Sequence, residues 1–133
     1  MLETGNLETF LLEDLSKTLL AQRLKHITLS AVPRWLGPHV ATASRYEHSI
    51  AVGNLSLLVS GGTIRDKLLL TAASVLHDAG DGPFPHISDQ SMKEKLGFTH
   101  EGALRFAFEH GLGEDFKVLE RYGLGLDEVY AVL

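Results

Sequence analysis

The sequence of 133 residues contains no cysteine, which excludes disulfide bonds and leaves histidine, aspartate and glutamate as the plausible metal ligands. It has no apolar run long enough to cross a membrane, and its first residues are acidic where a signal peptide would be basic. Positive charge is scarce too, since 12 Lys and Arg face 17 Asp and Glu. This balance argues against non-specific nucleic-acid binding, which needs an excess of cations. We therefore expect a cytoplasmic protein that holds any phosphate at a local site.

The alternation of apolar and polar residues that marks a half-buried strand is also missing. Apolar side chains recur instead every three or four residues over 7–27, which predicts one helix or a broken helical pair. A second helix is expected from residue 42 or 44 to residue 60, and a third, capped by Thr63, over IRDKLLLTAASVLHD. The remaining helices are expected over residues 92–96, 99–110, 114–122 and 126–133.

These elements predict an all-α fold, a compact bundle of about six helices in which residues 1–133 form a single domain. The second and third helices should be its core pair, because the third is apolar nearly all the way round. The last helix has only about two turns, so we expect the C-terminal part of the fold to be missing. Val129, Val132 and Leu133 would then lack cover, which favours a homo-oligomer or a lost C-terminal region.

A His77-Asp78 pair closes the third helix, where the carbonyl ends of the helix dipole favour a cation. His48 lies on the preceding helix, and a short glycine turn between the two helices could bring it opposite the pair. Two imidazoles and a carboxylate suit Mn, Fe, Zn, Ni or Co better than Ca. A simpler interpretation of His48 remains open, in which it is a helix histidine bonded in the core or partly solvated.

Three further features carry chemistry. The stretch GDGPFPHISD follows the pair, and its glycines and prolines predict a stiffened loop that pre-positions the ring of His86. His100 and Glu101 follow Thr99 and form either an acid/base pair or an ordinary capped helix start. Arg45 offers a forked donor for phosphate oxygens, or pairs with a surface carboxylate at little energetic value.

The segments SRYEHSIAVG, VLHDAGDGPFPHISD and FTHEGALRF occur in an order that resembles the HD-domain metal-dependent phosphohydrolases, and within them the deoxynucleoside triphosphate triphosphohydrolase branch. The similarity is strongest over residues 22–110, beginning with QRLKHI. It implies an HD-domain-like fold and an enzyme that hydrolyses a nucleotide or a similar phosphate ester or anhydride through metal-activated water. The implied cofactor is a divalent metal ion (Mn, Fe, Zn, Ni, Co or Mg), and the implied partner is a phosphorylated small molecule.

The resemblance also implies a role for each motif residue. His48, His77 and Asp78 would be three of the four metal ligands of the family. Arg45 would contact substrate phosphate, and Asp81 would lie at the phosphate-binding position of the glycine-rich motif. The catalytic pocket would be lined by His86, Asp89, His100 and Glu101.

The sequence departs from the family pattern at two points. Asp81 replaces a histidine, and its negative charge repels phosphate unless a metal or a proton neutralises it. The fourth metal ligand, a later aspartate, has no recognisable counterpart, since neither Asp115 nor Asp127 lies in a family motif. These departures support an alternative hypothesis, in which the chain is a degenerate, non-catalytic HD module for nucleotide sensing or protein interaction.

Overall fold

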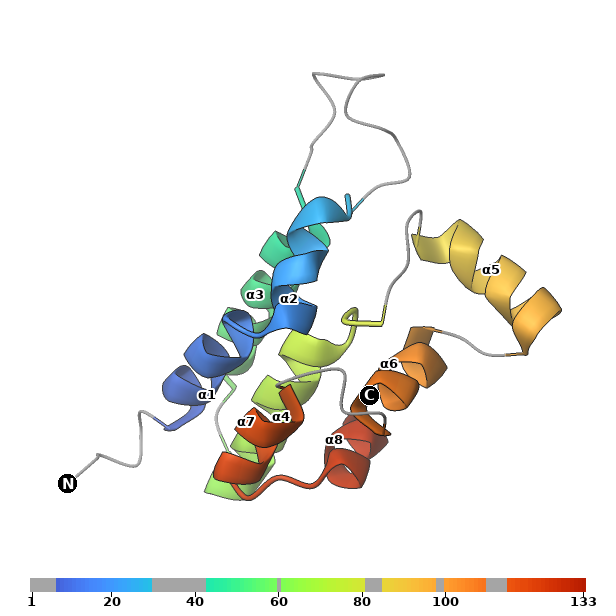
Figure 1. Cartoon of the computed structure of the whole chain (residues 1–133). Helices are drawn as coiled ribbons and strands as arrows, with labels where there is room; N and C mark the ends of the chain where they lie inside the picture. The colour runs from blue at the N-terminus through green and yellow to red at the C-terminus, as the bar shows by residue number, and fades with distance from the viewer. Residues whose placement is uncertain (1–6, 30–42, 60, 81–84, 98–99, 110–114) are drawn as a thin grey trace.

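The computed structural model describes residues 7–29, 43–59, 61–80, 85–97, 100–109 and 115–133. Within these ranges the chain forms eight α-helices and one 3-10 turn, and its β-structure is limited to an isolated bridge between Thr28 and Ser44. The all-α prediction is confirmed (Figure 1). The helices are α1 (Leu7–Ser16), α2 (Leu19–Arg23), α3 (Arg45–Ser56), α4 (Ile64–Leu76), α5 (Pro85–Leu96), α6 (His100–Glu109), α7 (Asp115–Arg121) and α8 (Leu126–Val132).

The N-terminal apolar pattern folds as a broken pair, one of the two predicted forms. The helix breaks between α1 and α2, where the hydroxyl of Thr18 accepts a hydrogen bond from the backbone of Ala21 and so caps α2. A 3-10 turn, Leu24–His26, then leads out of α2. The break lets both short helices turn apolar side chains inward, Leu15 from α1 and Ala21 from α2, both of which are buried.

Helices α3 and α4 form a hairpin, and each begins with a reciprocal capping box. Ser44 and Glu47 exchange side chain to backbone hydrogen bonds at the start of α3, and Thr63 and Asp66 do the same at the start of α4. The turn between the helices contains Gly61 and Gly62 with φ of 98° and 77°, a left-handed conformation that glycine adopts without strain. Helix α3 ends at Ser56, earlier than the predicted residue 60.

Helix α4 packs against α1, α3 and α8, and Figure 1 shows it between α1 and α8. From Leu68 onward its residues are buried or half-buried, which agrees with a pattern that lacks a polar face. None of the described helices combines the length and apolarity needed to span a bilayer. The largest fully buried apolar side chains of the described core are Leu11, Leu15, Leu24, Val75, Leu76, Leu119 and Val129.

The C-terminal helix corrects one expectation. Val129 was expected to lack cover, but it is only 1% exposed, because α8 folds back onto α4. Arg65 of α4 fixes this arrangement by donating two hydrogen bonds to Glu128, of 2.6 and 2.5 Å. Val132 and Leu133 remain partly exposed, as the sequence suggested.

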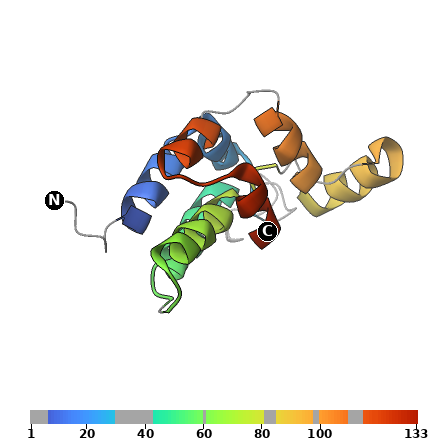
Figure 2. The same cartoon turned by 90° about the horizontal axis from the view of Figure 1, so that it is seen from below.

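Helix α5 corrects a second expectation. The sequence predicts a loop over 80–89 and a short helix over 92–96, whereas α5 already begins at Pro85. Proline is favoured at the first position of a helix, where its missing N–H costs nothing, so Pro85 starts the helix that it was expected to prevent. Both views show α5 to one side of the other helices (Figures 1 and 2). Residues 81–84 lie outside the described part of the chain.

A hydrogen bond between α1 and the end of α7 yields a prediction about stability and pH. Tyr122 donates to the carboxylate of Asp14 over 2.7 Å, and burial together with this bond raises the pKa of Tyr122 from 10.0 to about 12. A raised pKa means that the folded state prefers the protonated phenol, so the stabilisation is complete below pH 10 and is lost as pH rises toward about 12.

We expect Tyr122→Phe to lower the free energy of unfolding by about 1 to 2 kcal/mol near neutral pH. The variant should also show a smaller loss of stability between pH 10 and 12 than the wild type. Urea unfolding at a series of pH values measures both effects. An unchanged pH slope in the variant would show that the Tyr122 phenol is not the group that titrates.

Candidate metal centre

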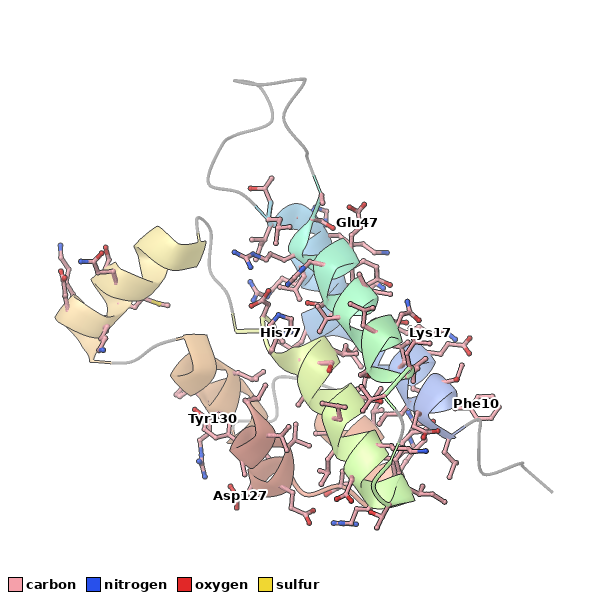
Figure 3. The ribbon with its side chains drawn as sticks, turned by 180° about the vertical axis from the view of Figure 1, so that it is seen from behind. Phe10, Lys17, Glu47, His77, Asp127 and Tyr130 are labelled. Carbon is pink, nitrogen blue, oxygen red and sulfur yellow. The ribbon has the colours of Figure 1, made fainter. Side chains whose placement is uncertain are left out.

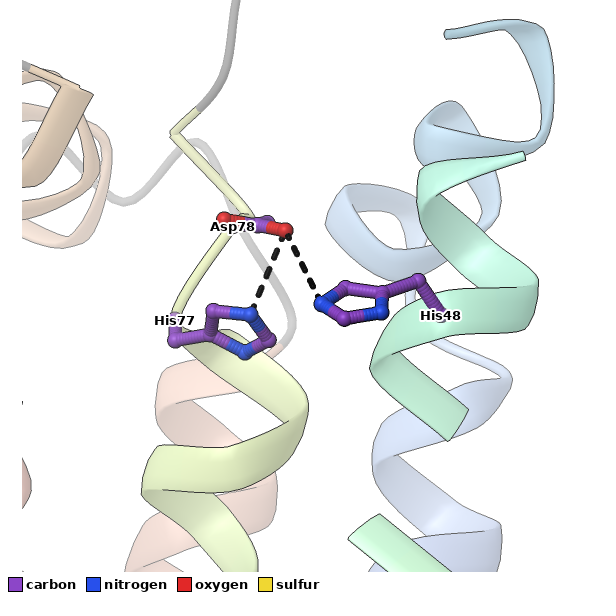
Figure 4. A group of neighbouring side chains, drawn as sticks. All are labelled: His48, His77 and Asp78. Atoms are coloured by element: carbon purple, nitrogen blue, oxygen red, sulfur yellow. Dashed lines mark ion pairs between the residues drawn. The ribbon is translucent and has the colours of Figure 1, made fainter. Parts of the chain in front are cut away.

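Two histidines and an aspartate meet where the N-terminal half of α3 passes the end of α4. The ring nitrogen Nε2 of His77 lies 3.2 Å from Oδ2 of Asp78, and Nε2 of His48 lies 4.0 Å from the same oxygen (Figure 4). The two imidazole rings meet edge to face at 69°, with centroids 5.3 Å apart. The ligand atoms of the three residues all lie within 4.8 Å of one another, so the group could hold a metal ion. The predicted proximity of His48 to the His77-Asp78 pair is therefore found.

The orientation of the His77 ring is fixed by its own helix. Its Nδ1 lies 2.6 Å from the carbonyl oxygen of Ser74, one turn earlier in α4. A carbonyl can only accept, so Nδ1 carries the proton, and Nε2 is the nitrogen that faces Asp78. A lone pair facing a carboxylate oxygen is repelled unless a proton or a metal ion lies between them. This arrangement is the one that a metal-ligating histidine adopts, with its second nitrogen bonded to a carbonyl.

Asp78 is the most buried member of the group, with 7% of its surface exposed. Burial alone would raise its pKa, but the hydrogen bond and charge of His77 and the nearby guanidinium of Arg45 outweigh burial and lower it to about 2. The carboxylate is consequently ionised at neutral pH. An ionised, buried carboxylate beside two imidazoles attracts a cation.

Arg45 is the first residue of α3, and Ser44, which caps that helix, sets its position. The Nη1 atom of Arg45 lies 3.0 Å from Oδ2 of Asp78, and both side chains are almost fully buried. The alternative of a surface ion pair is therefore wrong, because the partner carboxylate lies inside the protein. The guanidinium therefore lies within the group.

Two residues that help to position the site were not predicted from the sequence. Ser74 fixes the tautomer of His77 through a backbone carbonyl, which no side-chain pattern reveals. Arg23 donates from Nη2 to the carbonyl oxygen of Ala79 over 2.8 Å and so ties α2 to the turn that carries Asp78. Arg23 belongs to the QRLKHI segment, which resembles the family. That resemblance did not indicate the contact between Arg23 and Ala79.

The other predicted site residues lie partly or wholly outside the described part. The backbones of His86 and Asp89 belong to α5, and those of His100 and Glu101 to α6, but their side chains are not described. Asp81 lies outside the described residues altogether. The placement of His86 on a loop is wrong, since it is the second residue of α5.

The late aspartates do not complete the group in the described structure. Asp127 is exposed on α8, where it accepts a hydrogen bond of 2.9 Å from Arg105, and Figure 3 shows it well away from His77. Asp115 begins α7, but its side chain is not described. Among the described residues, the group therefore offers three protein ligands, a number that catalytic metal sites commonly have.

A helical bundle with a His-Asp pair at the end of its central helix and a histidine on the neighbouring helix defines a class of protein. The chain belongs to the HD-domain family, whose model matches residues 45–122. It is 31% identical over 128 residues to deoxynucleoside triphosphate triphosphohydrolase SAMHD1 of Gallus gallus, an alignment that covers 84% of this chain and 21% of the relative. The Homo sapiens protein of the same name is 32% identical over 119 residues, covering 77% of this chain and 19% of the relative. The chain thus spans about a fifth of the length of these curated relatives.

Proposed function

We propose that the chain is a metal-dependent phosphohydrolase domain that acts on a nucleotide. The observation that carries the proposal is the convergence of Nε2 of His77 and Nε2 of His48 on one oxygen of Asp78, with the ring of His77 held from its other nitrogen by the carbonyl of Ser74. Membership of the HD-domain family and similarity to deoxynucleoside triphosphate triphosphohydrolases support the substrate class.

The donor set fits a divalent transition metal. Two neutral imidazoles and one carboxylate contribute a single negative charge and no sulfur, which suits Mn, Fe, Zn, Ni or Co. Ligand bonds of about 2.1 Å place neighbouring ligand atoms about 3 Å apart, close to the 3.2 Å between His77 and Asp78. When bound, the metal would polarise a phosphoryl oxygen and lower the pKa of a water molecule. Its identity, Mg included, is a matter for experiment.

The residues of the chain divide the remaining work. His48, His77 and Asp78 hold the metal, and Arg45 stabilises negative charge on the phosphate. His86 and the His100-Glu101 pair transfer protons to the leaving oxygen and from the nucleophile. By the resemblance to the family, Asp89 would belong to the catalytic pocket and Asp81 to the phosphate-binding motif.

The test compares His48→Asn with His26→Asn, a matched change of an exposed histidine in the 3-10 turn. Purified proteins are equilibrated with Mn²⁺, desalted and analysed for metal by mass spectrometry. They are then incubated with deoxynucleoside triphosphates while phosphate, pyrophosphate and triphosphate are separated and measured. We expect about one metal per chain and hydrolysis in wild type and His26→Asn, and at least a tenfold loss of both in His48→Asn.

The alternative hypothesis of a non-catalytic HD module predicts a different result in the same experiment. A module that only senses nucleotides would be stabilised against heat by a nucleotide, since any ligand of the folded state raises its stability. It would release no phosphate, pyrophosphate or triphosphate over a long incubation. The proposed metal site would be contradicted if wild type hydrolysed the nucleotide and His48→Asn and His26→Asn reduced that hydrolysis by the same factor.

A further inference from the structure

We infer that Arg45 and the metal compete for one oxygen atom of Asp78, so that Arg45 moves away from Asp78 when the metal binds. This inference rests on the proposed function. It concerns the contact between Arg45 Nη1 and Asp78 Oδ2, which is 3.0 Å long and buried. The buried guanidinium of Arg45 is thus a positive charge at the carboxylate where the metal ion, a second positive charge, has to bind.

The geometry identifies the shared atom. Oδ2 is the Asp78 oxygen that lies 3.2 Å from His77 and 4.0 Å from His48, so a metal held by both imidazoles would also bind Oδ2. Because the carbonyl of Ser74 holds Nδ1 of His77, that ring cannot offer its other nitrogen without breaking a hydrogen bond of 2.6 Å. The nitrogen that His77 offers to a metal is therefore Nε2, the one that lies next to Oδ2.

The electrostatic repulsion between the metal ion and the guanidinium favours the movement of Arg45 away from Asp78. A metal bond of about 2.1 Å and the guanidinium contact of 3.0 Å on the same oxygen would bring the two cations within about 5 Å of each other. At that separation in a partly buried site, the repulsion between charges of +2 and +1 corresponds to a change in affinity of well over tenfold. Wild-type metal affinity is accordingly reduced by the presence of Arg45.

The exchange has a consequence for the order of binding. While Arg45 contacts Asp78, its positive charge is neutralised by that carboxylate. Once the metal has bound Oδ2, Nη1 of Arg45 gives up this contact and can donate to a phosphate oxygen instead. Metal binding therefore prepares the phosphate site, which makes the two binding events cooperative.

The experiment measures Mn²⁺ affinity by isothermal titration calorimetry in wild type, Arg45→Gln and Arg45→Lys. Glutamine removes the charge but keeps an N–H donor toward Asp78, whereas lysine keeps the charge and loses the fork. We expect Arg45→Gln to bind Mn²⁺ at least about tenfold more tightly than wild type, and Arg45→Lys to bind within about threefold of it. Arg45→Met serves as a second neutral variant, and thermal melts with and without Mn²⁺ confirm that each protein is folded.

The opposite result is equally clear. If both neutral variants bind Mn²⁺ no more tightly than wild type, Arg45 merely supports Asp78 and the exchange is refuted, while metal binding and hydrolysis by wild type would leave the proposed function standing. If neither wild type nor any variant binds Mn²⁺, the metal site and the exchange fall together. If the two neutral variants bind Mn²⁺ and wild type does not, the result would support competition between Arg45 and the metal for Asp78.

Discussion

Replacing Asp78 by asparagine is expected to weaken metal binding at least about a hundredfold and to destabilise the protein by about 3 to 5 kcal/mol. The first effect follows because the amide oxygen carries no negative charge to hold a divalent ion. The second follows because Arg45, which is buried beside Asp78, is left without its anionic partner. Breaking a buried ion pair by removing one partner is among the most costly changes that a single substitution can make.

Asp127→Asn provides the matched control. Asp127 also accepts a hydrogen bond from an arginine, but 84% of its side chain is exposed and the bond lies on the surface. We expect its substitution to change the free energy of unfolding by less than about 1 kcal/mol and to leave metal affinity unaltered. Urea unfolding and Mn²⁺ titration of the two variants check this contrast. Equal stability losses in both would show that burial of the Arg45-Asp78 pair has no energetic consequence.

Gly53→Leu is expected to destabilise the protein by about 3 kcal/mol or more, although leucine is a much better helix former than glycine. Gly53 lies within α3 where that helix meets two others. A Cβ atom added there would approach Cδ1 of Leu12 to 2.5 Å and Cγ2 of Val75 to 3.0 Å, before any further leucine atom is counted. Both neighbours are buried and have little room to move.

The control for this change is Asn54→Leu at the next position of α3, which is exposed. It brings a comparable gain in helix propensity without a steric clash, so its effect should stay within about 0.5 kcal/mol. A second test adds Leu12→Ala to Gly53→Leu. Because the added side chain would then find space, we expect the double variant to lose less stability than the sum of the single variants. Strict additivity would show that Leu12 is not the obstacle.

The sequence is a good guide to this fold where its signals are local. Ser44, Thr63 and the glycine turn mark the α3-α4 hairpin because capping and left-handed turns depend on a few adjacent residues. The same hairpin brings His48 opposite Asp78, so the centre of the site was predictable. Pro85 misled the prediction, since proline both breaks a preceding helix and starts a new one.

Contacts between distant segments could not be predicted in the same way. Arginine is normally exposed, and nothing in SRYEHS reveals that Arg45 is enclosed with Asp78. The cover over Val129 depends on where α8 packs, and the bond from Tyr122 to Asp14 joins opposite ends of the chain. Each of these is decided by tertiary packing rather than by the pattern around the residue.

The glycine turn between α3 and α4 also bears on how the site forms in time. All three proposed ligands lie within residues 48–78, so closing one short loop brings them together. The entropy lost in closing such a loop is small, and contacts of low sequence separation form early in folding. A metal ion could therefore bind a nascent hairpin and act as a nucleus for the rest of the domain, so that metal supply would govern the rate of folding as well as the stability of the folded state.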